Sequence, residues 1–252
     1  MSITLADIVR INAERGYSVA ELSEYSGVPV GTLQKILNGD RVDAVETFFP
    51  ALENVLLGAD HAEKRQGEYT LEDYFRLPED RRAELIDGVI YDMAAPTPLH
   101  QMIAGTVYAE ILAFIKKNEG NCLPFIAPAD VQLDCDSRTM VQPDVFVLCK
   151  QEKLKRFGIY GAPDFVLEIL SDSTRKKDMT VKLTKYMEAG VKEYWVIDPD
   201  RRLLIVYIGE EEGIPRLYPL QGDIGMNLFD GRLRIDLDEI NDLINRFGSL
   251  EE

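Results

Sequence analysis

The segment Pro163-Asp164-Phe165-Val166-Leu167-Glu168-Ile169-Leu170 decides the fold of the larger part of this 252-residue chain. Its apolar run predicts a buried strand, with Glu168 in the middle. Because burying an unpaired carboxylate costs several kcal/mol, Glu168 must be paired, exposed on a solvated face, or bound to a metal. The strand predicted before it opens with Pro143-Asp144. One such acid is equally well explained as a surface charge on an edge strand, but two on consecutive strands favour a functional site.

Strands alternate with helices on both sides of this segment, which predicts a mixed β-sheet flanked by helices. The Asp87-Gly88 pair between apolar runs is a strong signal for a hairpin with a short loop. The predicted strands and hairpins cover residues 83–91, 125–133, 143–148, 163–170, 193–197 and 203–208, with a further strand or two in the C-terminal tail. The predicted helices cover residues 69–77, 99–117, 174–189 and 237–247.

The helix predicted after Glu168 carries Asp178, Lys182 and Tyr186, which are spaced so that they share one helix face. If this helix crosses back over the sheet, Lys182 is aimed at the strand carboxylates. The alternative is a plain Asp178–Lys182 surface pair, worth a few tenths of a kcal/mol. Lys185 lies in a neighbouring direction on the same helix, and we expect it to be exposed.

Residues 1–58 contain only helical patterns, in four amphipathic segments. The second segment, Val19 to Ser26, begins after Ser18, with Glu21 completing a capping-box pattern, and it ends at Gly27. The third runs from Pro29 to Asn38. Two short helices separated by a tight glycine turn resemble the helix-turn-helix of the Cro and phage-repressor class.

In that class the helix after the turn lies in the major groove of DNA, which makes Thr32, Gln34, Lys35 and Asn38 the expected DNA contacts. The charge argues the other way, because residues 1–58 carry four basic against eight acidic side chains and phosphate neutralisation normally supplies much of the affinity. DNA binding and docking to a protein both stay open for this domain. Residues 59–68 are polar without apolar periodicity and are interpreted as a linker to a second domain at 69–252.

The net charge of −16 excludes a broad basic surface for non-specific binding to nucleic acid or to anionic membranes. The dense basic run Arg175-Lys176-Lys177 lies just before Lys182, and we expect it to meet phosphates there. The chain has three cysteines, Cys122, Cys135 and Cys149. Their number is odd, and no two of them are spaced as a Cys-x-x-Cys pair. This argues against a disulfide framework and a zinc ribbon, and we expect buried free thiols.

The chain also lacks the patterns of membrane or secreted proteins. Its longest apolar runs are far shorter than the roughly 20 residues that span a bilayer. The N-terminus has no basic start followed by an apolar stretch, so no secretion signal is expected. We therefore expect a cytoplasmic protein without membrane contact.

Six motifs follow one another in the larger part of the chain: Glu84-Leu85-Ile86-Asp87-Gly88, Pro98-Leu99-His100-Gln101, Pro143-Asp144-Val145, Leu167-Glu168-Ile169-Leu170-Ser171-Asp172-Ser173-Thr174, Asp178-(three)-Lys182-(three)-Tyr186, and Gly190-Val191-Lys192-Glu193-Tyr194-Trp195-Val196-Ile197-Asp198-Pro199. In this order they resemble the Uma-type family of putative restriction endonucleases, a branch of the restriction-endonuclease-like PD-(D/E)XK superfamily. The resemblance spans residues 69–240, and the last motif is highly specific.

The resemblance implies a restriction-endonuclease-like mixed sheet flanked by helices, with Mg²⁺ or Mn²⁺ held by Asp144 and Glu168. In the strand signature Pro-Asp…(Asp/Glu)-x-Lys the lysine would stand at position 170, where this chain has Leu170. The family pattern then implies Lys182 as a lysine moved to the next helix, and Glu84 as an acid pointing into the same site. Asp172 departs from the proline that is more frequent after the serine, which loosens the loop without removing a catalytic group.

His100 lies at the start of a predicted helix, where a neutral imidazole could carry a proton near pH 7. A histidine bonded to a loop carbonyl explains it equally well. The leading hypothesis is a metal-dependent phosphodiesterase acting on DNA, with an appended helix-turn-helix domain. The alternative is a catalytically inactive DNA- or protein-binding regulator that uses the nuclease fold as a scaffold. The loop-rich C-terminus with its strand edges suggests a homodimer.

Overall fold

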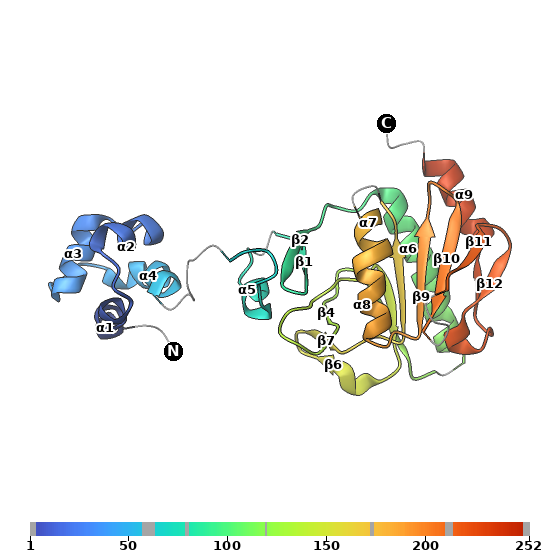
Figure 1. Cartoon of the computed structure of the whole chain (residues 1–252), viewed down its shortest axis with the longest axis horizontal. Helices are drawn as coiled ribbons and strands as arrows, with labels where there is room; N and C mark the ends of the chain where they lie inside the picture. Colours follow the sequence, from blue (N-terminus) through green and yellow to red (C-terminus); the bar gives the residue numbers. More distant parts are fainter. Residues whose placement is uncertain are drawn as a thin grey trace. The chain divides into compact units, whose positions relative to one another are not determined.

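The computed structural model describes residues 4–56, 64–78, 81–118, 120–171, 174–209 and 214–248. The chain divides into two compact units, residues 1–64 and 65–252, and each has its own hydrophobic core (Figure 1). Residues 59–63 of the predicted linker lie outside the described residues, and the predicted domain limits stay a prediction. Among the helices of the described chain, none is long and apolar enough to cross a membrane.

The first unit is a small helical bundle. Ser18 begins the second helix with the predicted capping box, because its hydroxyl accepts from the Glu21 N–H and its own N–H donates to the Glu21 carboxylate at 2.9 Å. Gly27 ends that helix with φ +68°, a left-handed conformation that glycine adopts without strain. The helices are α1 (Leu5–Arg15), α2 (Val19–Ser26), α3 (Val30–Asn38), the 3₁₀ turn η1 (Val45–Phe48) and α4 (Phe49–Leu56).

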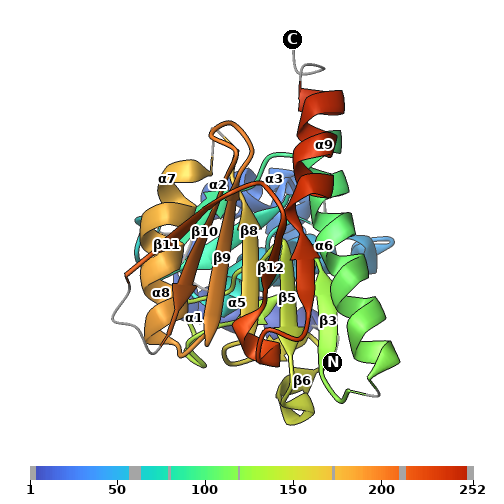
Figure 2. The same ribbon diagram turned by 90° about the vertical axis from the view of Figure 1, so that its right-hand side faces the viewer.

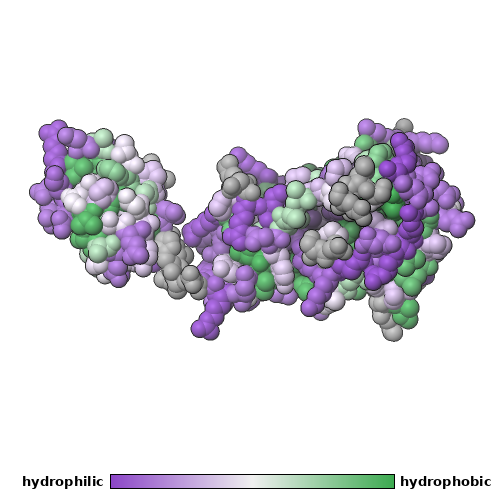
Figure 3. All heavy atoms as spheres, turned by 90° about the horizontal axis from the view of Figure 1, so that it is seen from above, coloured by the Kyte–Doolittle hydropathy of each residue, from purple (hydrophilic) through white to green (hydrophobic). Residues whose placement is uncertain are grey.

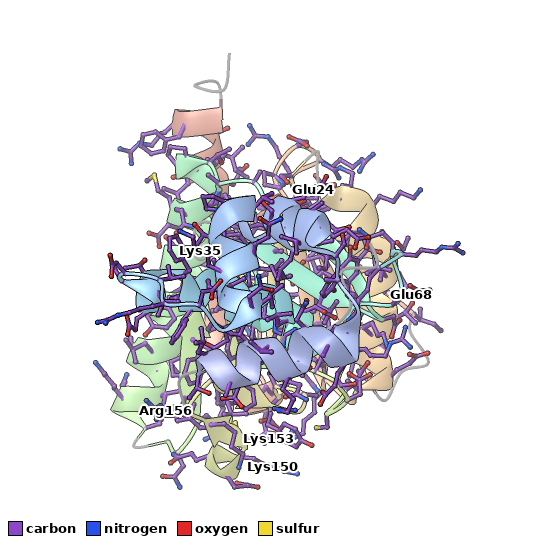
Figure 4. All side chains as sticks on the ribbon, turned by 90° about the vertical axis from the view of Figure 1, so that its left-hand side faces the viewer. Glu24, Lys35, Glu68, Lys150, Lys153 and Arg156 are labelled. Carbon is purple, nitrogen blue, oxygen red and sulfur yellow. A yellow bond between two sulfur atoms is a disulfide. The ribbon has the colours of Figure 1, made fainter. Side chains whose placement is uncertain are left out.

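The α2–α3 pair has the order that the sequence predicted, but its role as a DNA-binding helix-turn-helix stays a prediction. Leu33 and Ile36 of α3 are buried in the core of the bundle, whereas Gln34, Lys35 and Asn38 are exposed and Thr32 is half-buried. Lys35 is labelled on α3 in Figure 4. The polar side chains predicted to meet DNA are therefore mostly on the solvent side of this helix.

The second unit is built on a six-stranded sheet in the order β11-β10-β9-β8-β5-β3 (Figure 2). β8 and β9 are parallel, and every other neighbouring pair is antiparallel. The mixed sheet that the sequence predicted is therefore present. Its strands are β3 (Leu123–Ile126), β5 (Val145–Leu148), β8 (Phe165–Ile169), β9 (Glu193–Asp198), β10 (Leu203–Ile208) and β11 (Arg216–Pro219).

Helices cover both faces of this sheet (Figure 2). The long helix α6 (Pro98–Lys117) and α9 (Leu237–Phe247) pack on one face, where they share a core with the side chains of Phe165, Leu167 and Ile169. The opposite face packs against one continuous helical segment made of α7 (Arg175–Lys177), η3 (Asp178–Lys182) and α8 (Leu183–Glu188). Because β8 is buried on both faces, its sequence is a continuous apolar run interrupted only by Glu168.

Smaller elements complete the unit. The predicted hairpin is confirmed: Ala83–Ile86 (β1) pairs with Val89–Asp92 (β2), and both loop residues have positive φ, 51° at Asp87 and 79° at Gly88. The remaining elements are α5 (Leu71–Phe75), β4 (Val131–Gln132), the 3₁₀ turn η2 (Gln151–Lys153), β6 (Leu154–Lys155), β7 (Gly158–Tyr160), β12 (Asp223–Gly225), the 3₁₀ turn η4 (Asn227–Phe229) and β13 (Arg234–Asp236). Hydrophilic residues form most of the surface in Figure 3, with apolar patches between them.

Two sequence predictions are wrong. The strand predicted at 125–133 is two strands, β3 and β4, in different sheets, because Pro128 has no N–H to continue a ladder. Cys122 and Cys149 form a disulfide instead of remaining free, and Cys135 is exposed. The spacing of the cysteines could not show this, because only the pairing of Leu123 with Leu148 places the two thiols opposite each other.

We expect the second unit to fold without the first. A chain that begins at Lys64 keeps the complete sheet and its two covering layers, so thermal unfolding followed by circular dichroism should remain cooperative. Loss of a cooperative transition in this truncated chain would show that residues 1–63 contribute to the core of the larger unit.

Glu110 should make stability depend on pH. Burial and the nearby carboxylates of Glu239 and Asp236 raise the pKa of this carboxyl group of α6 to about 7. The hydrogen bond that it accepts from the Asp236 N–H lowers the pKa but does not cancel the rise. A carboxyl group with a higher pKa in the folded than in the unfolded state binds its proton more tightly in the folded state. The free energy of unfolding therefore decreases as the pH rises from about 4.5 to 7. After allowance for solvent screening, Glu110→Gln should stabilise by about 1 kcal/mol at pH 8 and not at pH 4. Thermal melts test this, with exposed Glu152→Gln controlling for the lost charge.

Candidate active site

Two strand acids lie side by side on the face of the sheet that packs against η3 and α8. Val145 of β5 pairs with Leu167 of β8, so the next antiparallel step places Asp144 opposite Glu168. Asp144 Oδ2 accepts a hydrogen bond from the Ile169 N–H at 2.7 Å, which ties the end of β5 to β8. Glu168 therefore lies on a central strand, and Asp144, one residue before β5, is held beside it by its side-chain hydrogen bond to β8.

Lys182 lies between Glu168 and two further acids, Glu84 and Asp178. Its Nζ is 2.5 Å from Glu168 Oε1, 2.9 Å from Glu84 Oε1 and 3.7 Å from Asp178 Oδ1. The side chains of Lys182 and Glu168 are 3% and 4% exposed, and that of Glu84 is fully buried. Glu84 comes from β1, Glu168 from the central sheet and Lys182 from the covering helix, so one ammonium group joins three separate elements.

The helical segment is wound as a π-turn between Asp178 and Lys182. Such turns insert an extra residue into a helix and recur at functional sites. One turn further on, the Tyr186 hydroxyl donates to Glu168 Oε1 at 2.7 Å, so Lys182 and Tyr186 both contact the same oxygen. Sequence spacing predicted the shared face of these residues, but it did not indicate the contact of the tyrosine with Glu168.

A second lysine also belongs to the cluster. Lys177 Nζ is 2.5 Å from Glu84 Oε2 and lies over the Tyr91 ring, 5.6 Å from its centroid. The sequence placed Lys177 among the expected phosphate contacts together with Arg175 and Lys176. Of these, Lys176 is exposed, whereas Arg175 pairs with Asp198 and Asp200. DNA contacts by the three residues stay a prediction.

Gln142 is a further neighbour that the sequence analysis did not identify. Its backbone N–H donates to Glu84 Oε1 at 3.0 Å, and its side chain donates to Tyr74 and Asp130. Its position two residues before Asp144 was the only signal. Lys185 differs from expectation as well: it is 14% exposed and pairs with Asp87 and Asp134, each at 2.6 Å, because α8 packs against these loops.

His100 contacts the other strand acid. Its Nε2 lies 3.0 Å from Asp144 Oδ2, and Thr97 caps the start of α6 by accepting from the His100 N–H. Burial lowers the pKa of His100, but the Asp144 carboxylate outweighs this and holds that pKa above its ordinary value. Its Nδ1 is buried without a hydrogen-bond partner in the described chain. A proton-carrying role for His100 stays a prediction.

The cluster contains more acid than base. Burial raises the pKa of Glu84, but Lys182 and Lys177 reverse this effect and lower that pKa to about 2. Burial and the nearby Asp144, Asp178 and Glu84 raise the pKa of Glu168 well above its ordinary value despite Lys182. Asp178 Oδ1 is buried without a hydrogen-bond partner among the described residues. Four carboxyl groups face two ammonium groups, which favours binding of a further cation.

The donor set fits a divalent ion held by few protein ligands. Within the described residues, no three His, Cys, Asp or Glu side chains converge in a metal-binding geometry. Mg²⁺ commonly binds through one or two carboxylates, with water and substrate phosphate completing its coordination. In the described chain, the partners of Asp144 contact Oδ2 and those of Glu168 contact Oε1. A second oxygen of each carboxylate could therefore serve a cation.

Comparisons with known proteins agree with this architecture. The model of the Uma2 family, described as putative restriction endonuclease, matches residues 71–228. A crystal structure of a putative nuclease belonging to DUF820 from Anabaena variabilis is similar, with a TM-score of 0.58 and 21% sequence identity. The similarity covers 69% of this chain and 98% of that protein, and it concerns the fold. No curated protein matches the chain.

Lys182 should be essential for stability, because it is buried rather than part of a plain surface pair with Asp178. Lys182→Met removes the cation shared by buried acids, so we expect a loss of about 3 kcal/mol in the free energy of unfolding. Urea unfolding measures this loss, with Lys176→Met as the exposed control. The double variant Glu84→Gln/Lys182→Met should lose less than Lys182→Met alone, because one unpaired charge disappears with its partner. Equal losses in both would contradict the buried ion pair.

Proposed function

This chain belongs to the Uma2 family of putative restriction endonucleases, and we propose that its larger unit is a magnesium-dependent endonuclease that hydrolyses phosphodiester bonds of DNA. One observation carries the proposal: Asp144, one residue before β5, lies next to Glu168 of the paired strand β8, and Lys182 reaches Glu168 from a different element. Two acids and a lysine at one site can bind a divalent ion and a phosphate together. The lysine comes from the covering helix because the strand position holds Leu170, which is buried.

Asp144 and Glu168 would hold the metal ion. When bound, Mg²⁺ supplies Lewis-acid activation of the phosphoryl group and of the attacking water. Lys182 would place its ammonium charge beside the phosphoryl oxygens as negative charge grows on them. The Tyr186 hydroxyl orients Glu168 by donating to Oε1. His100 orients Asp144 through Oδ2 and could hold a proton at Nε2.

Glu84 has a different task in this proposal. Its two carboxylate oxygens are occupied by Lys182 and Lys177, and its Oε1 also accepts from the Gln142 N–H. A carboxylate with these partners is better suited to hold the lysines in place than to bind a metal. We therefore propose Glu84 as a positioning residue that keeps two ammonium groups at the site.

Nicking of supercoiled plasmid by the full chain tests the proposal, in the presence of Mg²⁺, Mn²⁺ or EDTA. We expect nicking with either metal and none in EDTA. Asp144→Asn and Glu168→Gln keep the side-chain volumes but remove the ligand charges, so each should lose about 100-fold or more in rate. Asp242→Asn, which changes an exposed acid of α9, should retain activity.

Calorimetric titration with Mg²⁺ or Mn²⁺ separates metal binding from catalysis. Heat of binding should be present in the parent protein and strongly reduced in Asp144→Asn and in Glu168→Gln. If all three proteins bind the metal equally and nick plasmid at equal rates, these acids are not the site. If none nicks DNA, the fold acts as a scaffold for binding.

A further inference from the structure

We propose that a surface beside the acid–lysine cluster binds an unpaired nucleic-acid strand next to the phosphate to be cleaved. This β6 surface consists of Leu154, Lys155, Arg156 and Phe157 from β6 and the loop after it, together with Phe75 of α5. The inference rests on the proposed nuclease function for its substrate class. The binding itself can be tested without cleavage.

The charge of this region differs from that of the whole chain. Residues 150–157 contain four basic side chains and one acidic side chain, whereas the chain carries −16 overall. Lys155 and Arg156 are exposed, as is Lys150 at the start of the segment. Figure 4 shows Lys150, Lys153 and Arg156 along the lower edge of the second unit. Such a local concentration of cations attracts phosphates even where the protein as a whole repels them.

Aromatic rings lie among these cations. Phe75 is 54% exposed and Phe157 is 41% exposed, and their ring centroids lie 6.3 Å apart in an edge-to-face arrangement. The two rings come from segments more than eighty positions apart, so the fold brings them together on the surface. Leu154 beside them is 45% exposed. Exposed aromatics among basic side chains are typical of sites where unpaired bases stack.

A cavity of about 410 Å³ is lined by four residues of this surface and extends to Gln142, a neighbour of the candidate active site. Its lining includes Phe157, Arg156, Phe125 and Gln142. The backbone N–H of Gln142 donates to Glu84, so one wall of the cavity is bonded directly to the acid–lysine cluster. The volume lies within the range of small-ligand sites and suits a single nucleotide.

The polar groups of the cavity suit a base. The carboxylate of Asp130, which also lines it, accepts hydrogen bonds from Tyr74 and Gln142, both at 2.9 Å, so two donors stabilise its charge. Gln142 Oε1 is buried and has no hydrogen-bond partner in the described part of the chain. This oxygen can accept from a base N–H. A duplex conceals the faces and the Watson–Crick edges of its bases, so we infer an unpaired strand as the occupant.

Fluorescence anisotropy of a labelled single-stranded DNA oligonucleotide tests the inference, using the full chain in EDTA so that no cleavage occurs. Lys155→Glu/Arg156→Glu should weaken binding at least about 10-fold and flatten its salt dependence. Phe157→Ala should weaken binding about 5-fold or more through lost stacking. The matched control is Arg232→Glu/Arg246→Glu, which changes two exposed arginines elsewhere by the same charge and should stay within about twofold of the parent.

The outcomes separate this inference from the proposed nuclease function. Absence of single-strand binding by the parent protein, equal losses in the test and control variants, or tighter binding of a matched duplex would overturn the inference. Plasmid nicking could persist in each of these cases. If the surface variants lose binding while the parent never cleaves DNA, the surface stands and the catalytic proposal fails.

Discussion

The burial of one ammonium group, that of Lys182, is the constraint on which the second unit depends. A lysine that is 3% exposed can stay charged only among carboxylates, and here it lies within 2.9 Å of both Glu84 and Glu168. These acids come from a small hairpin and from the central sheet. If either element shifted, a charged group would be left buried without its partner. The same contact that holds the layers together therefore also assembles the candidate site.

The central sheet supplies Glu168 to the candidate site, and the covering helix supplies Lys182. The antiparallel step from Val145–Leu167 brings Asp144 opposite Glu168, which lies on a strand buried on both faces. Position 170, directly after β8, is the buried, apolar Leu170, and the positive charge beside Glu168 comes from the π-turn at Asp178–Lys182. The Lys182 ammonium group on this helix lies 2.5 Å from Glu168 Oε1, which is the distance of a direct ion pair.

Charge is distributed unevenly over the molecule, and this affects the kind of partner that it can attract. The chain has a net charge of −16. Two members of the basic run before Lys182 form ion pairs within the protein, Arg175 with Asp198 and Lys177 with Glu84. These cations neutralise the acids of the fold. Exposed cations beside exposed aromatic rings occur instead on the β6 surface, which the sequence analysis left without an assignment. A strongly acidic protein can thus present a local surface for phosphates next to a cluster of its own acids.

The sequence by itself determined the features that depend on neighbours along the chain. Apolar periodicity predicted the mixed sheet and its helices, the Asp87-Gly88 turn predicted the hairpin, and the capping box of Ser18 and Glu21 predicted the start of α2. Local signals of this kind involve residues a few positions apart, so they can be recognised in the sequence before the fold is known. Only the tertiary structure decided which distant groups meet: Lys177 with Glu84, Tyr186 with Glu168, and Cys122 with Cys149. These contacts follow from strand register and from the packing of the helix on the sheet, where a shift of one residue turns a side chain to the other face.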